Sequence, residues 1–153
     1  MHETTYTSPL GPLHLRADDD ALRALTFGAA PRDDDSPILA ATRAQLDEYF
    51  ASERTAFDLP LRLEGSPWEQ RVWAELQTIG YGETTSYGAI AARLGAPGSA
   101  RAVGSANGRN PISIIVPCHR VIGASGALTG YAWGVAHKAA LLDLERGVPA
   151  LFA

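Results

Sequence analysis

The chain has one cysteine, Cys118, among its 153 residues. A single cysteine excludes an internal disulfide and a zinc site built from several cysteines. The sequence also has no run of eighteen apolar residues and no signal peptide. From these absences we expect a cytoplasmic protein that does not span a membrane.

Acidic residues are absent from 84 to 142, but that segment does contain basic side chains: Arg93, Arg101, Arg109, Arg120 and Lys138. The net charge of the whole chain is −4, which disfavours a nucleic-acid protein if the charge is averaged over all residues. The charge is segregated, however, because most acidic residues precede residue 66. A basic face on the carboxy-terminal part would suit contacts with phosphates. The alternative is that short Gly- and Ala-rich segments hold few carboxylates by chance.

Residues 1–62 have the pattern of a small α+β unit. Three short strands, separated by Gly, Pro and Asp turns, are predicted at residues 4–7, 12–17 and 22–27. Ser36 and Pro37 provide an N-cap and a first-turn proline for a helix that continues to about Ser52. Two Asp triplets lack the spacing of oxygen ligands around a metal, so we interpret them as solvated turns. Residues 63–66 are the predicted junction to the remainder of the chain.

The segment Ser66–Glu69 is a capping box with a proline in the first turn, and it predicts the start of a helix. The apolar positions of this helix share one face: Trp68, Val72, Trp73, Leu76 and Ile79. Two shorter helices follow, one capped by Ser86 and continuing to Ala92, the other capped by Ser99 and continuing to about Ala106. A tight turn between them indicates a helix-turn-helix.

The apolar run from Ile112 to Val116 is predicted to be a buried strand that ends at Pro117, which has no N–H for a ladder. Cys118 would then lie at a strand end, where sites often form. The ordinary alternative is a small buried hydrophobic side chain. His119 follows directly, and a histidine near a cysteine can lower the pKa of the thiol. Because consecutive side chains in extended chain point to opposite faces, we expect a bridging water between Cys118 and His119, not a direct hydrogen bond.

Several short motifs surround this cysteine in a fixed order: Arg101-Ala-Val-Gly104, Asn110-Pro111, Pro117-Cys-His-Arg-Val121, Gly130-Tyr131 and Lys138…Leu141-Leu142…Glu145. Together they resemble the O6-alkylguanine-DNA alkyltransferases, suicide DNA-repair proteins in which a cysteine takes up the alkyl group irreversibly. The resemblance extends over roughly residues 66–147 and is weak before that. It implies an α+β protein with a ribonuclease-H-like domain at residues 1–62 and a winged helix-turn-helix catalytic domain at residues 67–153. The wing would be a hairpin at residues 123–131.

The resemblance also implies a role for each catalytic residue. Cys118 would be the nucleophile, and His119 would act as its base through a water. Glu145, at the end of a closing helix predicted at residues 137–145, would orient His119. Asn110 would brace the active-site turn, and Tyr87 would donate a proton to the departing guanine.

Arg101 is the long side chain on the third predicted helix, whose neighbouring residues are small: Ala100, Ala102, Gly104, Ser105 and Ala106. The minor groove is about 6 Å wide, so a helix with small side chains can approach it closely. The resemblance implies that Arg101 enters the base stack and replaces the flipped-out nucleotide, although a solvated surface arginine is the simpler interpretation. Further contacts with the DNA or the base are expected from Tyr131, Val121, Ala102, Ser105 and Arg109.

Trp133 lies two residues after Tyr131, at a position that is glycine in many relatives of this family. Together with Ala132 it is expected to line the alkyl pocket. If the indole points inward, it would leave room for a methyl group but crowd a bulky O6 substituent. Packing against the closing helix is the alternative.

Two other classes of function use parts of the same pattern. A non-catalytic lesion sensor would keep the DNA-binding surface, but alkyltransferase-like proteins carry tryptophan in place of the cysteine, so Cys118 argues against it. A cysteine hydrolase using Cys118 and His119 would turn over and need no DNA. We therefore predict a monomer that acts on double-stranded DNA containing O6-alkylguanine, with O4-alkylthymine as a further candidate substrate, and that needs no cofactor or metal.

Overall fold

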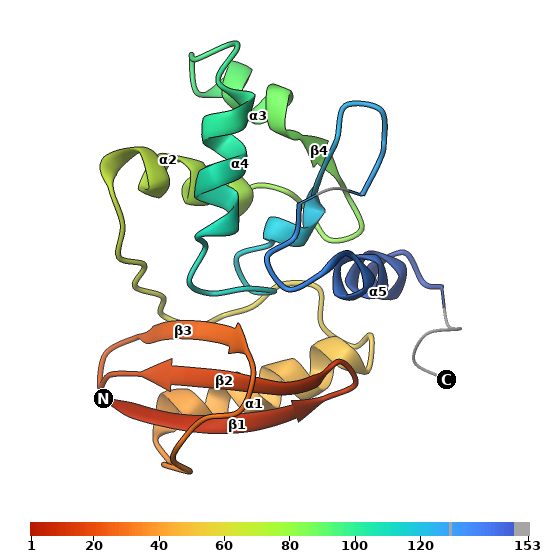
Figure 1. Ribbon diagram of the computed structural model, residues 1–153. Coiled ribbons are helices and arrows are strands. Elements are labelled where there is room, and N and C mark those ends of the chain that lie inside the picture. The colour runs from red at the N-terminus through yellow and green to blue at the C-terminus, as the bar shows by residue number, and fades with distance from the viewer. Residues whose placement is uncertain (129, 149–153) are drawn as a thin grey trace. The chain divides into compact units, whose positions relative to one another are not determined.

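The computed structural model describes residues 1–128 and 130–148, which form two compact units (Figure 1). The first unit comprises residues 1–63 and the segment 111–115. The second comprises residues 64–110 and the described residues from Val116 onward. The sequence predicted one boundary between the units, at residues 63–66, and did not predict that residues 111–115 return to the first unit. This return depends on backbone pairing with a distant strand, which local composition does not reveal. No helix within the described residues is long and apolar enough to cross a membrane.

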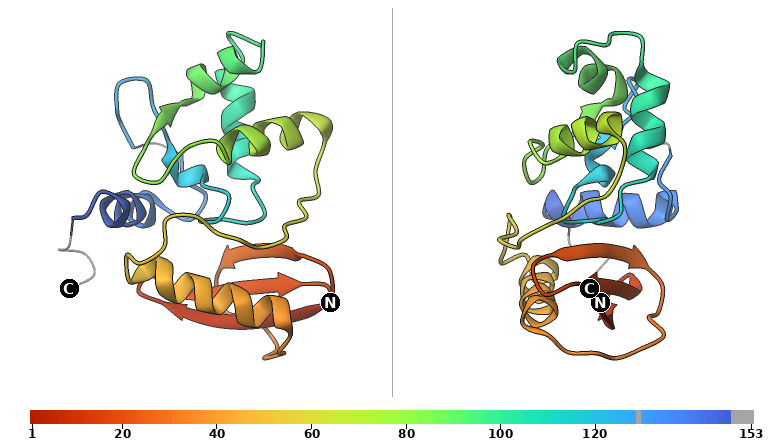
Figure 2. Two further views of the ribbon diagram at one scale, coloured as in Figure 1. Left: turned by 180° about the vertical axis from the view of Figure 1, so that it is seen from behind. Right: turned by 90° about the vertical axis from the view of Figure 1, so that its left-hand side faces the viewer.

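The first unit is an antiparallel sheet covered on one face by a helix, and its elements are β1 (His2–Ser8), β2 (Gly11–Ala17), β3 (Leu22–Phe27) and α1 (Pro37–Phe50) (Figure 2). The side chains of Leu13, Leu15 and Leu25 are fully buried. Ser36 caps α1 by accepting a hydrogen bond from the N–H of Leu39 at 3.1 Å. The α+β character predicted for this part is confirmed, and the first two strands are longer than predicted because the hairpin register continues to both ends.

The second unit is mainly helical, and its elements are α2 (Pro67–Leu76), β4 (Thr85–Ser86), α3 (Tyr87–Arg93), α4 (Ala100–Gly108), the 3₁₀ turn η1 (Cys118–Arg120), β5 (Val121–Ile122) and α5 (Val135–Glu145) (Figure 1). The capping box of α2 is confirmed, since Ser66 and Glu69 exchange side-chain to backbone hydrogen bonds. The helices α3 and α4 pack against each other as the predicted pair. Ser86 caps α3, whereas Ser99 precedes α4 without a side-chain capping bond, contrary to the prediction.

The strands β4 and β5 form a parallel pair in which Thr85 is opposite Val121. This pairing places the start of α3, at Tyr87, beside the end of η1, at Arg120, although the two are far apart in sequence. After β5, the N–H of Gly123 donates to the carbonyl of Ala127 at 2.9 Å, which closes a turn. A hairpin was predicted at residues 123–131, but the described residues of this segment form a turn without strands. The strand β5 pairs with β4 and not with a returning strand. Residue 129 lies outside the described residues.

The predicted strand at residues 112–116 is wrong. One bridge joins Ile112 to Leu25, and the N–H of Ser113 donates to the carbonyl of Leu25 at 3.0 Å. Ile114 then has φ +71°, a left-handed conformation that is rare for a β-branched residue and ends the extended chain. The run is apolar because it is buried, and hydrophobicity by itself cannot distinguish a buried strand from a buried series of turns.

Candidate active site

Cys118 lies in a pair of tight turns. Pro117 has φ −82° and ψ 65°, the geometry of an inverse γ-turn, and the N–H of Cys118 donates to the carbonyl of Val116 at 2.8 Å. The N–H of Arg120 donates to the carbonyl of Pro117 at 3.0 Å, so the chain continues directly into η1. Cys118 is 4% exposed. The cysteine therefore lies at the start of a 3₁₀ turn and not at the end of a strand, and the fixed φ of proline suits this geometry.

Asn110 contacts the backbone just before the turn that holds Cys118. Its side chain is buried, and its Nδ2 donates to the carbonyl of Val116 at 2.7 Å. The same carbonyl accepts the N–H of Cys118. Both hydrogen bonds hold the peptide that leads into the proline, so Asn110 restrains the backbone from which the cysteine projects.

His119, Glu145 and Arg120 form a buried group in which the carboxylate of Glu145 lies between the other two side chains. Nε2 of His119 lies 2.7 Å from Oε2 of Glu145. Arg120 donates to both carboxylate oxygens, at 2.7 Å to Oε1 and 3.0 Å to Oε2, and also to the carbonyl of Ile79 at 2.6 Å. His119 and Arg120 thus stabilise the charged form of Glu145 and fix its position, and its role in orienting His119 stays a prediction.

The protonation states of this group follow from its burial and its charges. Burial lowers the pKa of His119, and Glu145 only partly opposes this effect. Burial would raise the pKa of Glu145, but its hydrogen bonds with His119 and Arg120 outweigh that effect and hold the pKa at about 2. At neutral pH, His119 is therefore neutral and donates its Nε2 proton to Glu145.

The other ring nitrogen of His119, Nδ1, then carries a lone pair. It is buried and has no hydrogen-bond partner within the part of the chain that the structure describes. No direct bond from Nδ1 to the sulfur of Cys118 is formed, as expected, although the reason is the 3₁₀ turn and not an extended chain. A water between Nδ1 and the cysteine would give His119 the position of a general base.

Replacing Glu145 by glutamine is expected to destabilise the protein at pH 7 by about 3 kcal/mol. The pKa of Glu145 is depressed in the folded protein, so its contribution to stability is present above about pH 4.5 and is lost as the pH falls towards 2. The deficit of Glu145→Gln should therefore shrink below pH 4. Urea unfolding at several pH values measures it, with the exposed Glu83→Gln as control. A deficit that does not change with pH would contradict the assignment of an ionised Glu145.

The predicted basic face needs a correction, because Arg120 and Lys138 are buried and cannot contact phosphates. Lys138 is fully buried, and its Nζ donates to the carbonyl of Val121 at 2.5 Å. Burial lowers the pKa of Lys138, and the nearby charge of Cys118 opposes this effect. Lys138 is thus part of the cysteine's surroundings. Its helical spacing with Leu141 and Glu145 on the buried face of α5 is the signal that could have revealed it.

The exposed arginines of α3, α4 and the residue after α4 differ in their partners. Arg93 lies 3.6 Å from Glu75, and Arg109 lies 3.6 Å from Glu69. Among residues 1–128 and 130–148, no carboxylate lies within ion-pair distance of Arg101. Within the described residues, its charge is therefore available to an external group.

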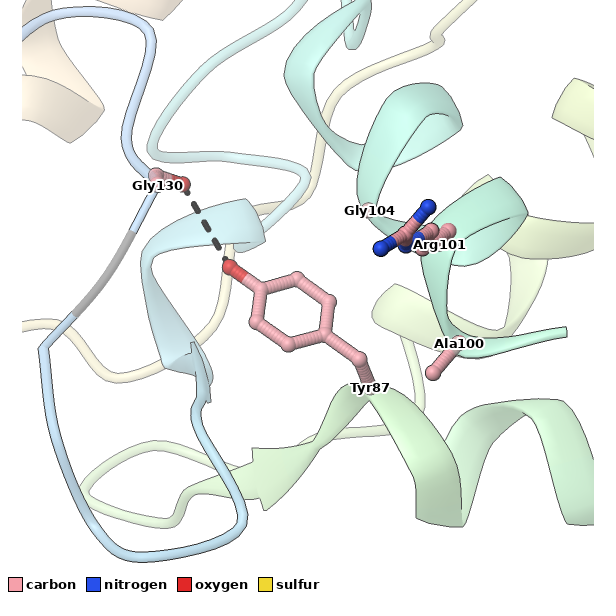
Figure 3. Close-up of a pocket in the computed structure, with 5 residues that line it drawn as sticks. All are labelled: Tyr87, Ala100, Arg101, Gly104 and Gly130. Carbon is pink, nitrogen blue, oxygen red and sulfur yellow. Dashed lines mark hydrogen bonds between the residues drawn. The ribbon is translucent and has the colours of Figure 1, made fainter. Parts of the chain in front are cut away.

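A cavity of about 390 Å³ lies beside Arg101, and its lining residues are Tyr87, Ala100, Arg101, Gly104 and Gly130 (Figure 3). Figure 3 shows the ring of Tyr87 between the loop at Gly130 and helix α4, and its hydroxyl donates to the carbonyl of Gly130 at 3.4 Å. A Cβ added to Gly104 would lie 3.8 Å from the Tyr87 ring. The absence of a side chain at Gly104 thus leaves space between the helix and the tyrosine.

The remaining predicted residues lie around this cavity or away from it. Ala102 and Ser105 are exposed on α4. Tyr131 is buried, Ala132 is exposed and Trp133 is partly buried, but none of the three lines the cavity. Their contacts with the alkyl group therefore stay predictions.

Comparison with known proteins follows the same division of the chain. The family model for the "6-O-methylguanine DNA methyltransferase, ribonuclease-like domain" matches residues 1–63, and the model for the DNA binding domain of the same family matches residues 67–147. The chain belongs to the O6-methylguanine-DNA methyltransferase family.

Bacterial members of this methyltransferase family are similar over most of both chains. The methylated-DNA–protein-cysteine methyltransferase of Mycobacterium tuberculosis H37Rv is 51% identical over 153 residues, covering 95% of this chain and 93% of the relative. The constitutive enzyme of Bacillus subtilis is 45% identical and covers 94% of each chain. The crystal structure of M. tuberculosis OGT in complex with DNA matches with a TM-score of 0.90 and 50% identity, over 100% of both chains.

Proposed function

We propose that this member of the methyltransferase family repairs DNA by direct reversal, in which Cys118 takes the alkyl group from O6 of guanine. The observation that carries the proposal is the buried cysteine followed by a neutral histidine, whose Nε2 is bound by ionised Glu145 and whose Nδ1 is basic. The thiolate is the reactive form of cysteine, and a base that acts through one water can generate it.

The reaction balances with the residues at hand. The proton of the Cys118 thiol passes through a water to Nδ1 of His119. The sulfur then attacks the alkyl carbon, so that an S–C bond forms while the C–O6 bond breaks and its electron pair stays with guanine. Tyr87, which lines the cavity beside α4, would give a proton to the departing guanine, and the proton taken up by His119 would return through solvent to the Tyr87 phenolate. The positive charge of buried Lys138 favours the thiolate.

DNA is the partner that this surface suits. The residues from α2 to α5 match the family's DNA binding domain, and a similar chain has been crystallised with DNA. Helix α4 presents small residues beside Arg101, which has no carboxylate partner among the described residues, and this supports close approach to the minor groove and insertion of Arg101 in place of a flipped nucleotide. Lesion specificity and single turnover are tested by intact mass after incubation with an O6-methylguanine duplex, where one methyl per chain is expected. Sedimentation of the same sample checks the expected monomer.

Trp133→Gly is expected to increase inactivation by O6-benzylguanine about tenfold relative to repair of O6-methylguanine DNA. The expectation assumes that the partly buried indole covers the alkyl pocket, where relieving a clash with a bulky group recovers about 1–3 kcal/mol. The two rates are compared in both proteins. Unchanged selectivity together with a lower melting temperature would instead assign Trp133 to packing.

A further inference from the structure

Asn107 is a buried polar residue in the last turn of α4, one helical turn before Asn110, and none of the roles above uses it. It is 2% exposed, and its Nδ2 donates to the carbonyl of Cys118 at 3.3 Å. The amide orientation is set by chemistry, because a carbonyl accepts hydrogen bonds and only the NH₂ end can donate. Asn107 thus touches the backbone of the reactive residue itself.

Asn107 and Asn110 form a matched pair on this backbone. The N–H of Asn110 donates to the carbonyl of Asn107 at 3.3 Å, so one turn of chain presents both side chains. Asn110 holds the carbonyl of Val116, and Asn107 holds the carbonyl of Cys118. The two amides therefore restrain the peptide that precedes Pro117 and the peptide that follows Cys118, and Pro117 has no N–H of its own to anchor the turn between them.

The amide oxygen of Asn107, Oδ1, indicates whether this side chain serves stability or position. Its Oδ1 is buried and has no hydrogen-bond partner among residues 1–128 and 130–148. A half-satisfied amide in a core destabilises a protein compared with an apolar side chain of the same shape. A residue selected only for packing would be leucine or methionine here, so the hydrogen bond to Cys118 accounts for the amide better than stability does.

We infer that Asn107 is a second positioning residue for the alkyl transfer, which directs the sulfur by fixing the first peptide of η1. The inference rests on the proposed function, since it concerns the same cysteine. Without the amide, the carbonyl of Cys118 loses the hydrogen bond from Nδ2 and retains the one from the N–H of Val121, which closes the 3₁₀ turn. The sulfur would then sample more directions, and fewer of them would allow in-line attack on the alkyl carbon.

The test compares Asn107→Leu, which has a similar volume and no donor, with Trp73→Phe as the matched control. Trp73 is also buried, and its indole donates at 2.8 Å to the carbonyl of Ala106 on the same helix, away from the cysteine. We expect Asn107→Leu to be alkylated by O6-methylguanine DNA about tenfold more slowly at every pH, a change of about 1.4 kcal/mol in the barrier. Its melting temperature should stay near that of the parent. Trp73→Phe should show the reverse, with a lower melting temperature and an unchanged rate.

A parental rate in folded Asn107→Leu, with or without a change in melting temperature, would overturn the positioning role. If that variant does not fold, Asn107→Asp decides, because it keeps the shape but loses the donor. It should react more slowly, with its rate profile moved to higher pH, and a parental rate and profile would overturn the role. Iodoacetamide modification of Cys118 in each protein separates the two proposals. If the parent reacts with iodoacetamide but not with the DNA, the proposed function is contradicted. The ratio of the iodoacetamide rates of Asn107→Leu and the parent still tests the role of Asn107 in that case.

Discussion

After incubation with a duplex that contains one O6-methylguanine, the protein should gain about 14 Da once per chain and then stop reacting. Water does not readily displace the carbon of a thioether, so the methylated cysteine cannot be regenerated. The gain should be confined to the peptide that contains Cys118, because the chain has no other cysteine. Intact mass and peptide mapping measure both expectations.

The control for this experiment is Cys118→Ser, which keeps the turn around Pro117 but replaces the sulfur with a much weaker nucleophile. We expect no detectable methyl transfer in this variant, with a melting temperature close to that of the parent. A mass gain that survives the substitution would place the acceptor elsewhere. More than one guanine repaired per chain would indicate a hydrolase and contradict the suicide mechanism.

Arg101→Ala should slow repair in duplex DNA by about 10²-fold while leaving alkylation by free O6-methylguanine base nearly unchanged. A nucleotide that leaves the stack costs a few kcal/mol, and an inserted guanidinium offsets that cost, whereas the free base needs no flipping. Arg101 suits this task because its charge is unpaired in the described residues and it borders the cavity with Tyr87. Rates on the two substrates are measured under single-turnover conditions.

The matched control is Arg93→Ala, which removes an exposed arginine that already has Glu75 as a partner. Its effect on duplex repair should be small and should disappear at high salt, as for a charge that contributes only to the general field. Equal losses of Arg101→Ala on duplex and free base would contradict the role in base flipping. They would indicate that the substitution disturbs the cavity itself.

Sequence patterns predicted the structure correctly where residues close together in the chain determine it. The alternation of β1 and β2, the N-cap at Ser36 and the capping box at Ser66 and Glu69 depend on residues within a few positions of one another. The motif around Cys118 likewise places the proposed nucleophile directly before its proposed base, His119. The sequence alone therefore determined the fold class and most helices, and it singled out Cys118 as the candidate nucleophile.

Contacts between distant segments decided the rest. The run at 112–116 pairs with Leu25 and turns at Ile114, and no property of the run itself distinguishes this path from a strand. Buried Lys138 donates to the carbonyl of Val121, and buried Arg120 donates to the carboxylate of Glu145 and the carbonyl of Ile79, all of which are distant in sequence.

The active site itself depends on such contacts. Glu145 reaches His119 across 26 residues, and the β4–β5 pair brings Tyr87 to the same region. A sequence pattern records which groups are present. Their protonation and their direction depend on burial and on hydrogen bonds between distant residues, which form only when the chain is folded.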